Sequence, residues 1–345
     1  MIAEAQTRMA SEAAEAPDRI ARQAAALAEP LARLAEWCAA SPPRAIMTCA
    51  RGSSDHAALF GKYALELATG RPVASLGPSV VSVYNTSLRA EGMLYITVSQ
   101  SGQSPDLLRC AEAAGAGGAL VVAIVNDPTS PLAGAADIVL DMQAGPEHAV
   151  AATKSFLCTL TTFARLVAAI APSPEIAGAL DRLPEQMLAG WRDPWGDRIV
   201  EEFRHVRRAF IIGRGPGLGV AAEMALKLKE VAGLHAEAFS AAEVHHGPKA
   251  AIGPDSPVIV LGSEDAAQVS LTDVAEALGA FGPAIFGSLV PMDGVIPLPT
   301  VSTGHPLTLP IVQAAAFYRF AEALSRRRGF DPDNPPSLKK VTRTL

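Results

Sequence analysis

Short apolar runs alternate with segments of helical periodicity along the first half of this 345-residue chain. The apolar runs predict buried strands and the periodic segments predict helices, with strands at 46–49, 94–98 and 119–125 and helices at 56–67, 106–114 and 150–170. Strands that are apolar on both faces and separated by helices are typical of a parallel sheet covered on both sides. The alanine-, glutamate- and arginine-rich stretch 2–39 predicts one or two helices, broken near Pro17.

The same order of elements begins again in the second half, with strands predicted at 209–212, 258–262 and 284–286 and helices at 219–232, 271–280 and 309–327. After the first strand of each half comes a similar turn, Ala-Arg-Gly-Ser-Ser at 50–54 and Gly-Arg-Gly-Pro-Gly at 213–217, and each turn leads into an alanine-rich helix. We therefore predict an α/β fold made of two tandem copies of one unit, each a parallel sheet flanked by helices.

Four parts follow from this organisation: an N-terminal helical segment 1–40, a first α/β domain 41–185, a second α/β domain 186–330 and a C-terminal tail 331–345. The boundary between the domains falls in the proline-containing stretch 172–195. Polar tails usually fray, but this one alternates polar and apolar residues and contains Leu338 and Val341, so we predict that it docks.

Charge and cysteine content narrow the classes of function. The net charge of −6 provides no general attraction for nucleic acid or anionic lipid, and the longest apolar run, 113–125, is too short to span a bilayer. No signal peptide is apparent, and the four cysteines form no C-x-x-C pair, so we expect a reducing, cytoplasmic location. Only 19% of residues are charged, which favours a buried subunit interface.

Candidate anion-binding chemistry lies in the stretch Val-Ser-Gln-Ser-Gly-Gln-Ser-Pro-Asp at 98–106, between a predicted strand and helix. Such a turn offers backbone N–H groups at the positive end of a helix, and its hydroxyls and amides suit a sugar phosphate. The alternative is an ordinary turn in which Ser104 only caps the helix. Ser54, in the turn after the preceding strand, could donate to the same anion, while Asp55 beside it could be a helix cap.

Candidate proton-transfer chemistry lies in the second half. Lys227 and Glu230 share one face of a predicted helix, either as a surface ion pair or as an acid–base pair that moves a proton between adjacent carbons. The segment 235–249 holds three of the seven histidines, and a histidine on its Gly-Pro turn could open a sugar ring, although metal binding has no supporting spacing. A docked Lys340 could form a Schiff base with a carbonyl. The glycines at 213–219 do not match a dinucleotide-binding fingerprint.

Taken together, these motifs resemble the double sugar isomerase (SIS) family, in particular the isomerase part of glucosamine-6-phosphate synthase and free-standing hexosamine-6-phosphate deaminases. The resemblance rests on S-Q-S-G at 99–102, A-x-x-T-K at 151–154, A-L-K-L-K-E at 225–230, H-A-E-A at 235–238, H-G-P at 246–248 and the terminal L-x-K. Where the family usually has S-Q-S-G-E-T, this chain has Gln103 and Ser104.

The resemblance implies a role for each matching residue. Phosphate is bound by a group of polar side chains and the sugar is lined by two apolar residues: Ser54, Ser99, Gln100, Ser101 and Ser104 for the phosphate, Val150 and Ala151 for the sugar. Glu230 carries the proton between C1 and C2, and Lys227 lies near the reacting oxygen. His246 opens the ring from a neighbouring subunit, and Lys340 contacts or covalently holds the open-chain sugar. We expect no cofactor and no metal ion.

The activity implied is conversion of an amino-sugar 6-phosphate, glucosamine 6-phosphate foremost, to fructose 6-phosphate and ammonia. Because Met1-Ile2 opens directly into a predicted helix, we expect no glutaminase domain, which favours ammonia release. The alternatives are a fructosamine-6-phosphate deglycase, another aldose–ketose isomerase, or a non-catalytic sugar-phosphate sensor. We expect a homodimer and no nucleic-acid or membrane partner.

Overall fold

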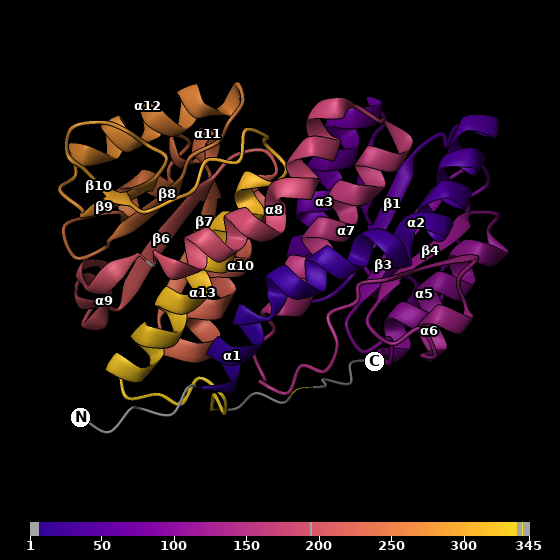
Figure 1. Ribbon diagram of the computed structural model, residues 1–345, viewed down its shortest axis with the longest axis horizontal. Coiled ribbons are helices and arrows are strands. Elements are labelled where there is room, and N and C mark those ends of the chain that lie inside the picture. Colours follow the sequence, from indigo (N-terminus) through magenta and orange to yellow (C-terminus); the bar gives the residue numbers. More distant parts are fainter. Residues whose placement is uncertain (1–6, 194, 337–339, 341–345) are drawn as a thin grey trace. The chain divides into compact units, whose positions relative to one another are not determined.

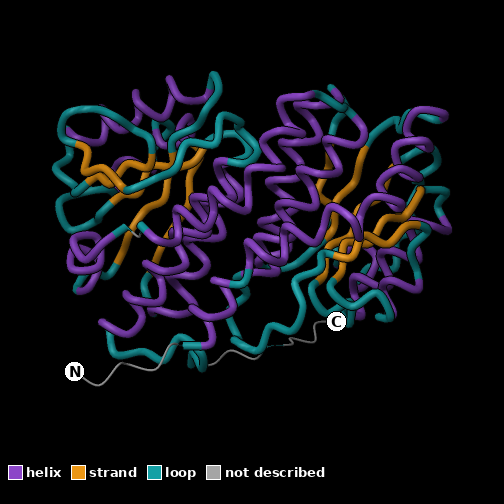
Figure 2. The backbone as a smooth tube through the Cα atoms, viewed as in Figure 1, coloured by secondary structure: helices purple, strands orange, loops and turns teal. Residues whose placement is uncertain are grey.

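The computed structural model describes residues 7–193, 195–336 and Lys340, and the chain divides into two compact units. The N-sheet unit comprises Asp18–Pro146 and Cys158–Leu180. The C-sheet unit comprises the described residues of Met1–Pro17, Glu147–Leu157 and Asp181–Lys340. Each unit contains one five-stranded parallel sheet, drawn in orange in Figure 2, which confirms the predicted α/β fold with two sheets flanked by helices.

The N-sheet has the strand order β2-β1-β3-β4-β5. Its strands are β1 (Ile46–Cys49), β2 (Val73–Ser75), β3 (Leu94–Ser99), β4 (Leu120–Val125) and β5 (Ile138–Asp141). Helices of this half of the chain are α2 (Ala16–Ala40), α3 (Ser53–Thr69), α4 (Ser79–Ser82), α5 (Pro105–Ala116), α6 (Pro131–Gly134), α7 (Lys154–Ile170) and α8 (Pro174–Arg192). Every residue of β3 is buried, because helices cover both faces of the sheet.

The C-sheet has the order β10-β9-β8-β6-β7, which is the same topology read from the other edge. Its strands are β6 (Arg208–Gly213), β7 (His235–Ser240), β8 (Val258–Leu261), β9 (Ile285–Ser288) and β10 (Val295–Leu298). The remaining helices are α1 (Arg8–Ala14), α9 (Gly196–Arg204), α10 (Gly217–Ala232), α11 (Ala241–Val244), the 3₁₀ turn η1 (Pro248–Ala251), α12 (Ala267–Gly279) and α13 (Leu309–Arg327). The shared strand order supports the interpretation of the chain as a repeated unit.

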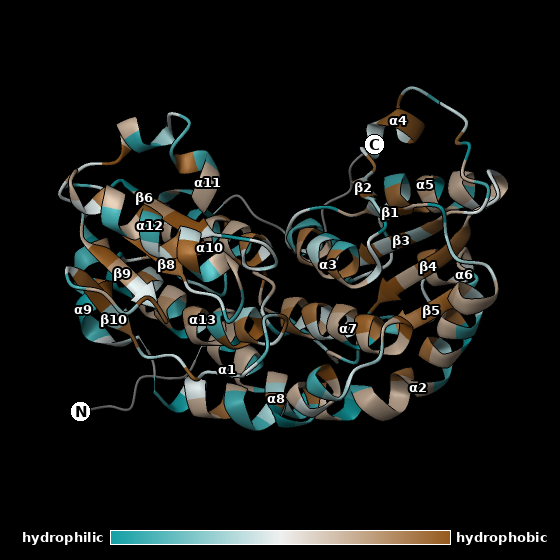
Figure 3. Ribbon diagram, turned by 90° about the horizontal axis from the view of Figure 1, so that it is seen from above, coloured by the Kyte–Doolittle hydropathy of each residue, from teal (hydrophilic) through white to brown (hydrophobic). Residues whose placement is uncertain are grey.

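Successive side chains of a strand point to opposite faces of the C-sheet, and their contacts show which helices cover each face. Phe210 and Ile212 pack with α11 and α12 on one face. On the other face the rings of Phe286 and Phe203 meet at 5.9 Å, and Phe203 also contacts Phe320 of α13. Figure 1 shows α12 and α13 on opposite sides of the strands, and the strand ribbons are largely hydrophobic in Figure 3. The sheet therefore lies inside the core of its unit.

Two adjacent parallel strands position the candidate anion site. β1 pairs with β3, and their connections leave toward opposite edges of the N-sheet. In sheets of this order, ligands bind beyond the carboxyl ends of these two strands. The turn after β1 and the serine-containing turn after β3 therefore lie side by side at the carboxyl ends of the strands, as the sequence predicts.

Some elements differ from the predictions. The helix predicted from residue 150 begins at Lys154, because residues 150–153 form a loop whose Thr153 N–H bonds the Glu147 carboxylate. The proline-containing stretch after residue 172 is largely the helix α8, with Pro184 inside it. The tail residues Leu338, Lys339, Val341 and Thr342 lie outside the described residues. None of the described helices is both long and apolar enough to cross a membrane.

Close packing of α3 against α7 gives a test of the N-sheet unit. A Cβ added at Gly61 would lie 2.4 Å from the buried Phe163 ring. Gly61→Ala should lower the free energy of unfolding by about 2 kcal/mol, measured by urea denaturation. As a control, Gly115→Ala in α5 meets its nearest atom at 3.5 Å and should raise stability by up to about 1 kcal/mol. Equal stabilisation by both changes would contradict the packing described.

Candidate functional site

The serine turn after β3 is held in one tight conformation by its own side chains. Ser99 Oγ accepts a hydrogen bond from the Gly102 N–H at 3.1 Å, and Ser101 Oγ accepts one from the Gln103 N–H at 3.3 Å. Gly102 has φ of +62°, and a Cβ there would lie 2.1 Å from Ser130 Oγ. Only glycine fits at this position, so the turn keeps its shape without a ligand.

Ser104 occupies the N-cap position of α5, but its side chain makes no capping hydrogen bond. Its role is therefore not the ordinary cap that the sequence allowed as an alternative. Within the described residues, the backbone N–H groups of Ser101 and Ser104 also have no hydrogen-bond partner. These hydroxyl and amide groups remain available to an anion at the positive end of α5.

The turn after β1 adds a second helix start at the same edge. Gly52, with φ of +55°, caps α3 without a side chain, and the space where its Cβ would lie is open. Ser54 is partly exposed in the first turn of α3. Asp55 is not the cap, because its own N–H already bonds the Gly52 carbonyl inside the helix. Ser54 and the serine turn thus lie at the ends of neighbouring strands.

Lys227 on α10 is a buried cation between two carboxylates. Its side chain is 1% exposed, its Nζ lies 3.6 Å from Glu223 Oε1, and it also pairs with Glu230. Glu223 is equally buried and accepts a hydrogen bond from the Tyr318 hydroxyl at 3.3 Å, whereas Glu230 is 19% exposed. The sequence alternative of a surface ion pair is therefore wrong, since the lysine is enclosed in the protein.

The charges of this cluster set the protonation of its members. Burial by itself would lower the pKa of Lys227, but the charges of Glu223 and Glu230 outweigh it and raise the pKa above the ordinary value. Burial and the charge of Glu223 raise the pKa of the Tyr318 hydroxyl well above its ordinary value. Lys227 therefore stays an ammonium and Tyr318 stays a neutral donor at physiological pH.

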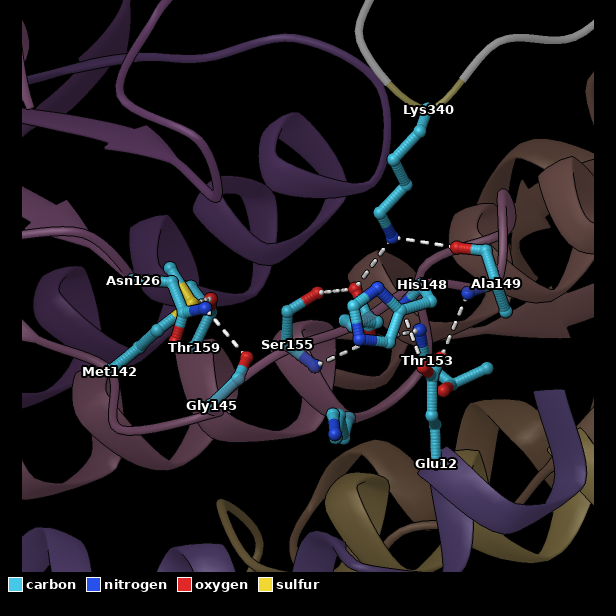
Figure 4. Close-up of polar contacts among 12 residues, drawn as sticks. Glu12, Asn126, Met142, Gly145, His148, Ala149, Thr153, Ser155, Thr159 and Lys340 are labelled. Atoms are coloured by element: carbon cyan, nitrogen blue, oxygen red, sulfur yellow. Dashed lines mark hydrogen bonds and ion pairs between the residues drawn. The ribbon is translucent and has the colours of Figure 1, made fainter. Parts of the chain in front are cut away.

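A second buried carboxylate, Glu147, lies in the loop before α7 and contacts the tail lysine. Lys340 Nζ donates to Glu147 Oε2 at 3.1 Å and to the Ala149 carbonyl at 2.7 Å (Figure 4). Glu147 also accepts from the Thr153 N–H and from both the N–H and the hydroxyl of Ser155. Burial would raise the pKa of Glu147, but the Lys340 charge and these three hydrogen bonds lower it below its ordinary value.

Helix α1 supports the same loop. The Glu12 carboxylate accepts hydrogen bonds from the N–H groups of His148 and Ala149. The N–H groups of Arg8 and Met9 in turn donate to Asp333 of the tail, each at 2.8 Å. The described part of the tail therefore contacts the C-sheet unit at two places, which agrees with a docked tail.

These groups form one electrostatic cluster in the C-sheet unit. The charge of Glu147 contributes to the raised pKa of both Lys227 and Tyr318. Sequence reasoning found Lys227, Glu230 and Lys340 but missed three members, Glu147, Glu223 and Tyr318. Glu223 could have been found, because it lies four residues before Lys227 on the same helix face. Glu147 and Tyr318 are far from Lys227 in the sequence, so no spacing relates them to it.

The other predicted residues are placed as follows. Val150 is partly buried and Ala151 buried, in the loop that follows the Ala149 carbonyl. His246 is exposed, two residues beyond the end of α11, and its N–H donates to the Glu243 carbonyl. Among the described residues, no hydrogen bond or ion pair joins His246 to the cluster, and no group of three or more His, Cys, Asp or Glu side chains is arranged to hold a metal ion.

The turn after β8 in the C-sheet corresponds by topology to the serine turn but differs in chemistry. There Glu264 accepts hydrogen bonds from the N–H groups of Thr303 and His305, each at 3.1 Å, and from the Thr303 hydroxyl at 2.8 Å. These bonds outweigh the effect of burial and lower the pKa of Glu264. The protein's own carboxylate thus occupies the donors at this edge.

Comparison with known proteins identifies similar chains. The SIS domain model matches residues 41–171 and 202–285. The chain is 32% identical over 315 residues to a glutamine–fructose-6-phosphate aminotransferase (isomerizing) of Zymomonas mobilis, covering 86% of this chain and 51% of that protein. The chain spans about half the length of the curated relatives it matches.

Two solved structures are similar over nearly the whole chain. One, named as a candidate phosphosugar isomerase of Silicibacter pomeroyi, is 40% identical with a TM-score of 0.90, covering 95% of this chain and 100% of that one. The other is the C-terminal domain of glucosamine-fructose-6-phosphate aminotransferase from Francisella tularensis, 25% identical with a TM-score of 0.86, covering 97% of this chain and 100% of that one.

The buried Glu147 gives a pH-dependent test of the cluster. Because its pKa is held below the ordinary 4.5, its carboxylate stabilises the fold above that pH and loses this contribution as the pH falls through the lowered value. Glu147→Gln should reduce the free energy of unfolding by about 3 kcal/mol at neutral pH, and the difference from wild type should shrink below pH 4.5.

The measurement is urea denaturation at neutral pH and below pH 4.5. The matched carboxylate-to-amide control is Glu202→Gln, since Glu202 is exposed. Glu202→Gln should change stability by less than about 0.5 kcal/mol. A Glu147 variant that is as stable as wild type at neutral pH would exclude the ion pair with Lys340 as a structural element.

Proposed function

Because the chain belongs to the SIS domain family, we propose that it is a phosphosugar isomerase acting on an amino-sugar 6-phosphate. In this proposal glucosamine 6-phosphate is converted to fructose 6-phosphate and ammonia. The relatives named above are named for phosphorylated sugars, and their similarity to this chain extends over most of its length. The proposal assigns phosphate binding to the serine turn and proton transfer to the cluster on α10.

The observation that carries the proposal is the buried Lys227 between Glu223 and Glu230. Burying ionised groups is unfavourable, and an apolar set of similar volume is often at least as stable. Such a cluster is therefore more readily explained by chemistry than by stability, since perturbed ionisable groups concentrate at functional sites. Glu230 is the suitable proton carrier, because it is the most exposed of the three side chains while still bonded to the ammonium.

The reaction follows from these roles. His246 opens the sugar ring, and Glu230 removes the proton from C2 to give an enolamine while the Lys227 ammonium stabilises the oxygen on C1. Glu230 returns the proton to C1, which leaves an iminium at C2. Water then adds to C2 and ammonia departs, giving the ketose. One water is consumed and no redox cofactor is needed.

Lys340 is placed by Glu147 and the Ala149 carbonyl beside the segment that holds Val150 and Ala151. In the proposal these two residues line the open-chain sugar and Lys340 contacts it. A covalent route is also testable: the Lys340 amine replaces ammonia at C2, and water later releases fructose 6-phosphate from the lysine iminium. Reduction with borohydride would then leave the sugar attached to Lys340.

The cysteines bear on the proposed location. Cys38, Cys49, Cys110 and Cys158 are free thiols, which agrees with a reducing compartment. We propose that this chain acts without glutamine, in a reducing cytoplasm.

The test is an assay of ammonia and ketose formation with glucosamine 6-phosphate, fructosamine 6-phosphate and glucose 6-phosphate, each with and without glutamine. Glucosamine 6-phosphate should give ammonia and fructose 6-phosphate without glutamine. Ammonia from fructosamine 6-phosphate alone would indicate a deglycase, and ketose from glucose 6-phosphate alone would indicate a plain isomerase. Ligand binding without exchange of the C2 proton with deuterated solvent would indicate a sensor.

Glu230→Gln should lower kcat by about 10³-fold, because general acid–base transfer supplies roughly that factor. Binding of the phosphorylated sugar should change little, since the serine turn is untouched. Steady-state kinetics and calorimetry measure the two quantities, with Glu202→Gln as the control that retains full activity. Wild-type turnover by the Glu230 variant would remove this residue from the mechanism.

The homodimer and the contribution of His246 from a neighbouring subunit remain part of the proposal. Mixed dimers of Glu230→Gln and His246→Asn subunits test both together. If His246 acts across subunits, one site of each mixed dimer is complete, and random mixing restores about a quarter of wild-type activity. If mixing restores none, while mass measurement shows that mixed dimers formed, His246 acts within its own chain or not at all.

A further inference from the structure

Arg51 lies in the turn between β1 and α3, next to Gly52 and the serines that start the helix. Its side chain is 47% exposed, although it makes an ion pair with Asp106, whose side chain is completely buried. Asp106 lies in the first turn of α5, two residues after Ser104. The ion pair therefore joins the turn after β1 to the turn after β3, at the carboxyl ends of the N-sheet strands where the phosphate is proposed to bind.

The geometry of the pair leaves part of the guanidinium group unused. Nε donates to Asp106 Oδ2 at 3.0 Å and Nη2 donates to the same oxygen at 2.8 Å. Within the described residues, Nη1 makes no hydrogen bond. Because the guanidinium is planar and its fork is fixed on Asp106, the direction of the remaining N–H groups is fixed as well.

Charge makes this arrangement significant for a phosphate ester. A sugar phosphate carries nearly two negative charges at neutral pH, and the serines and glutamine of the turn are neutral. Asp106 places a further negative charge beside Ser104, which by itself opposes a dianion. Arg51 both balances this carboxylate and carries donors suited to a phosphate, for which a guanidinium is the best-matched side chain.

We propose that Arg51 is a further phosphate-binding residue, oriented by Asp106, so that it donates from Nη1 to the phosphate held by the serine turn. This inference rests on the proposed assignment of the serine turn to phosphate but not on the reaction. Open space lies beside the neighbouring Gly52, where no described atom is within 4 Å of an added Cβ. The phosphate can therefore approach the turn from that side.

The test measures binding without turnover, by calorimetry with 1,5-anhydroglucitol 6-phosphate, which has no anomeric hydroxyl and cannot open. Arg51→Lys keeps the charge and the pairing with Asp106 but loses the fork, so its affinity should fall about 10-fold. Arg51→Met should lose about 100-fold. Arg89→Met is the matched control, because Arg89 is exposed and precedes β3 at the opposite edge of the sheet, and its affinity should stay at the wild-type value.

The double variant Arg51→Met, Asp106→Asn removes both charges and keeps the protein foldable if the single variant is not. Affinity that remains about 10-fold or more below wild type supports direct contact with phosphate. A return to wild-type affinity shows that Arg51 only neutralised Asp106 and overturns the inference. Equal binding of 1,5-anhydroglucitol and its 6-phosphate by wild type also overturns it. Absence of turnover with retained phosphate dependence would refute the proposed reaction and leave the role of Arg51 intact.

Discussion

Enclosure of the Lys227 ammonium is the constraint on which the candidate site depends. A fully buried cation is stable only when carboxylates and hydrogen bonds replace the water it has lost. Glu223 and Glu230 provide that replacement from the same helix, and Tyr318 completes the surroundings of Glu223 from α13. Because Tyr318 must reach Glu223, this arrangement fixes which face of α10 packs against α13. It also holds Glu230, the most solvent-exposed of the three side chains, next to the Lys227 ammonium.

Local patterns were sufficient to predict the α/β class, because the three central strands of each sheet are short apolar runs separated by helical segments. The outer strands were not predicted, since strands such as β7 (His235–Ser240) carry polar residues and are partly exposed. The two repeats could be found since their first turns carry similar residues at 50–54 and 213–217. Helix ends were less predictable where a distant side chain decides them. The start of α7 depends on Glu147, which bonds Thr153 and Ser155, and apolar periodicity alone extended that helix to residue 150.

The candidate site was predictable where chemistry is local and not where it is assembled by folding. Lys227 and Glu230 share a helix face by spacing, and the serines of the turn after β3 are contiguous. Glu147 and Lys340 are separated by 193 positions, so only the folded chain reveals their pairing. The contact of Arg51 with Asp106 joins two turns that are adjacent only because β1 and β3 are neighbours. The sequence predicts that Lys340 is docked, but its partners Glu147 and the Ala149 carbonyl became visible only with the fold.

The two sheets have the same strand order, yet the donors at the second edge are already engaged by Glu264. A carboxylate of the same chain competes with an external anion at a high effective concentration, because it cannot diffuse away. The duplication of the unit therefore does not double the number of anion-binding sites. Under the proposed function, one equivalent of phosphorylated sugar saturates each polypeptide, and the second copy of the unit supplies the proposed catalytic groups instead of a second anion site.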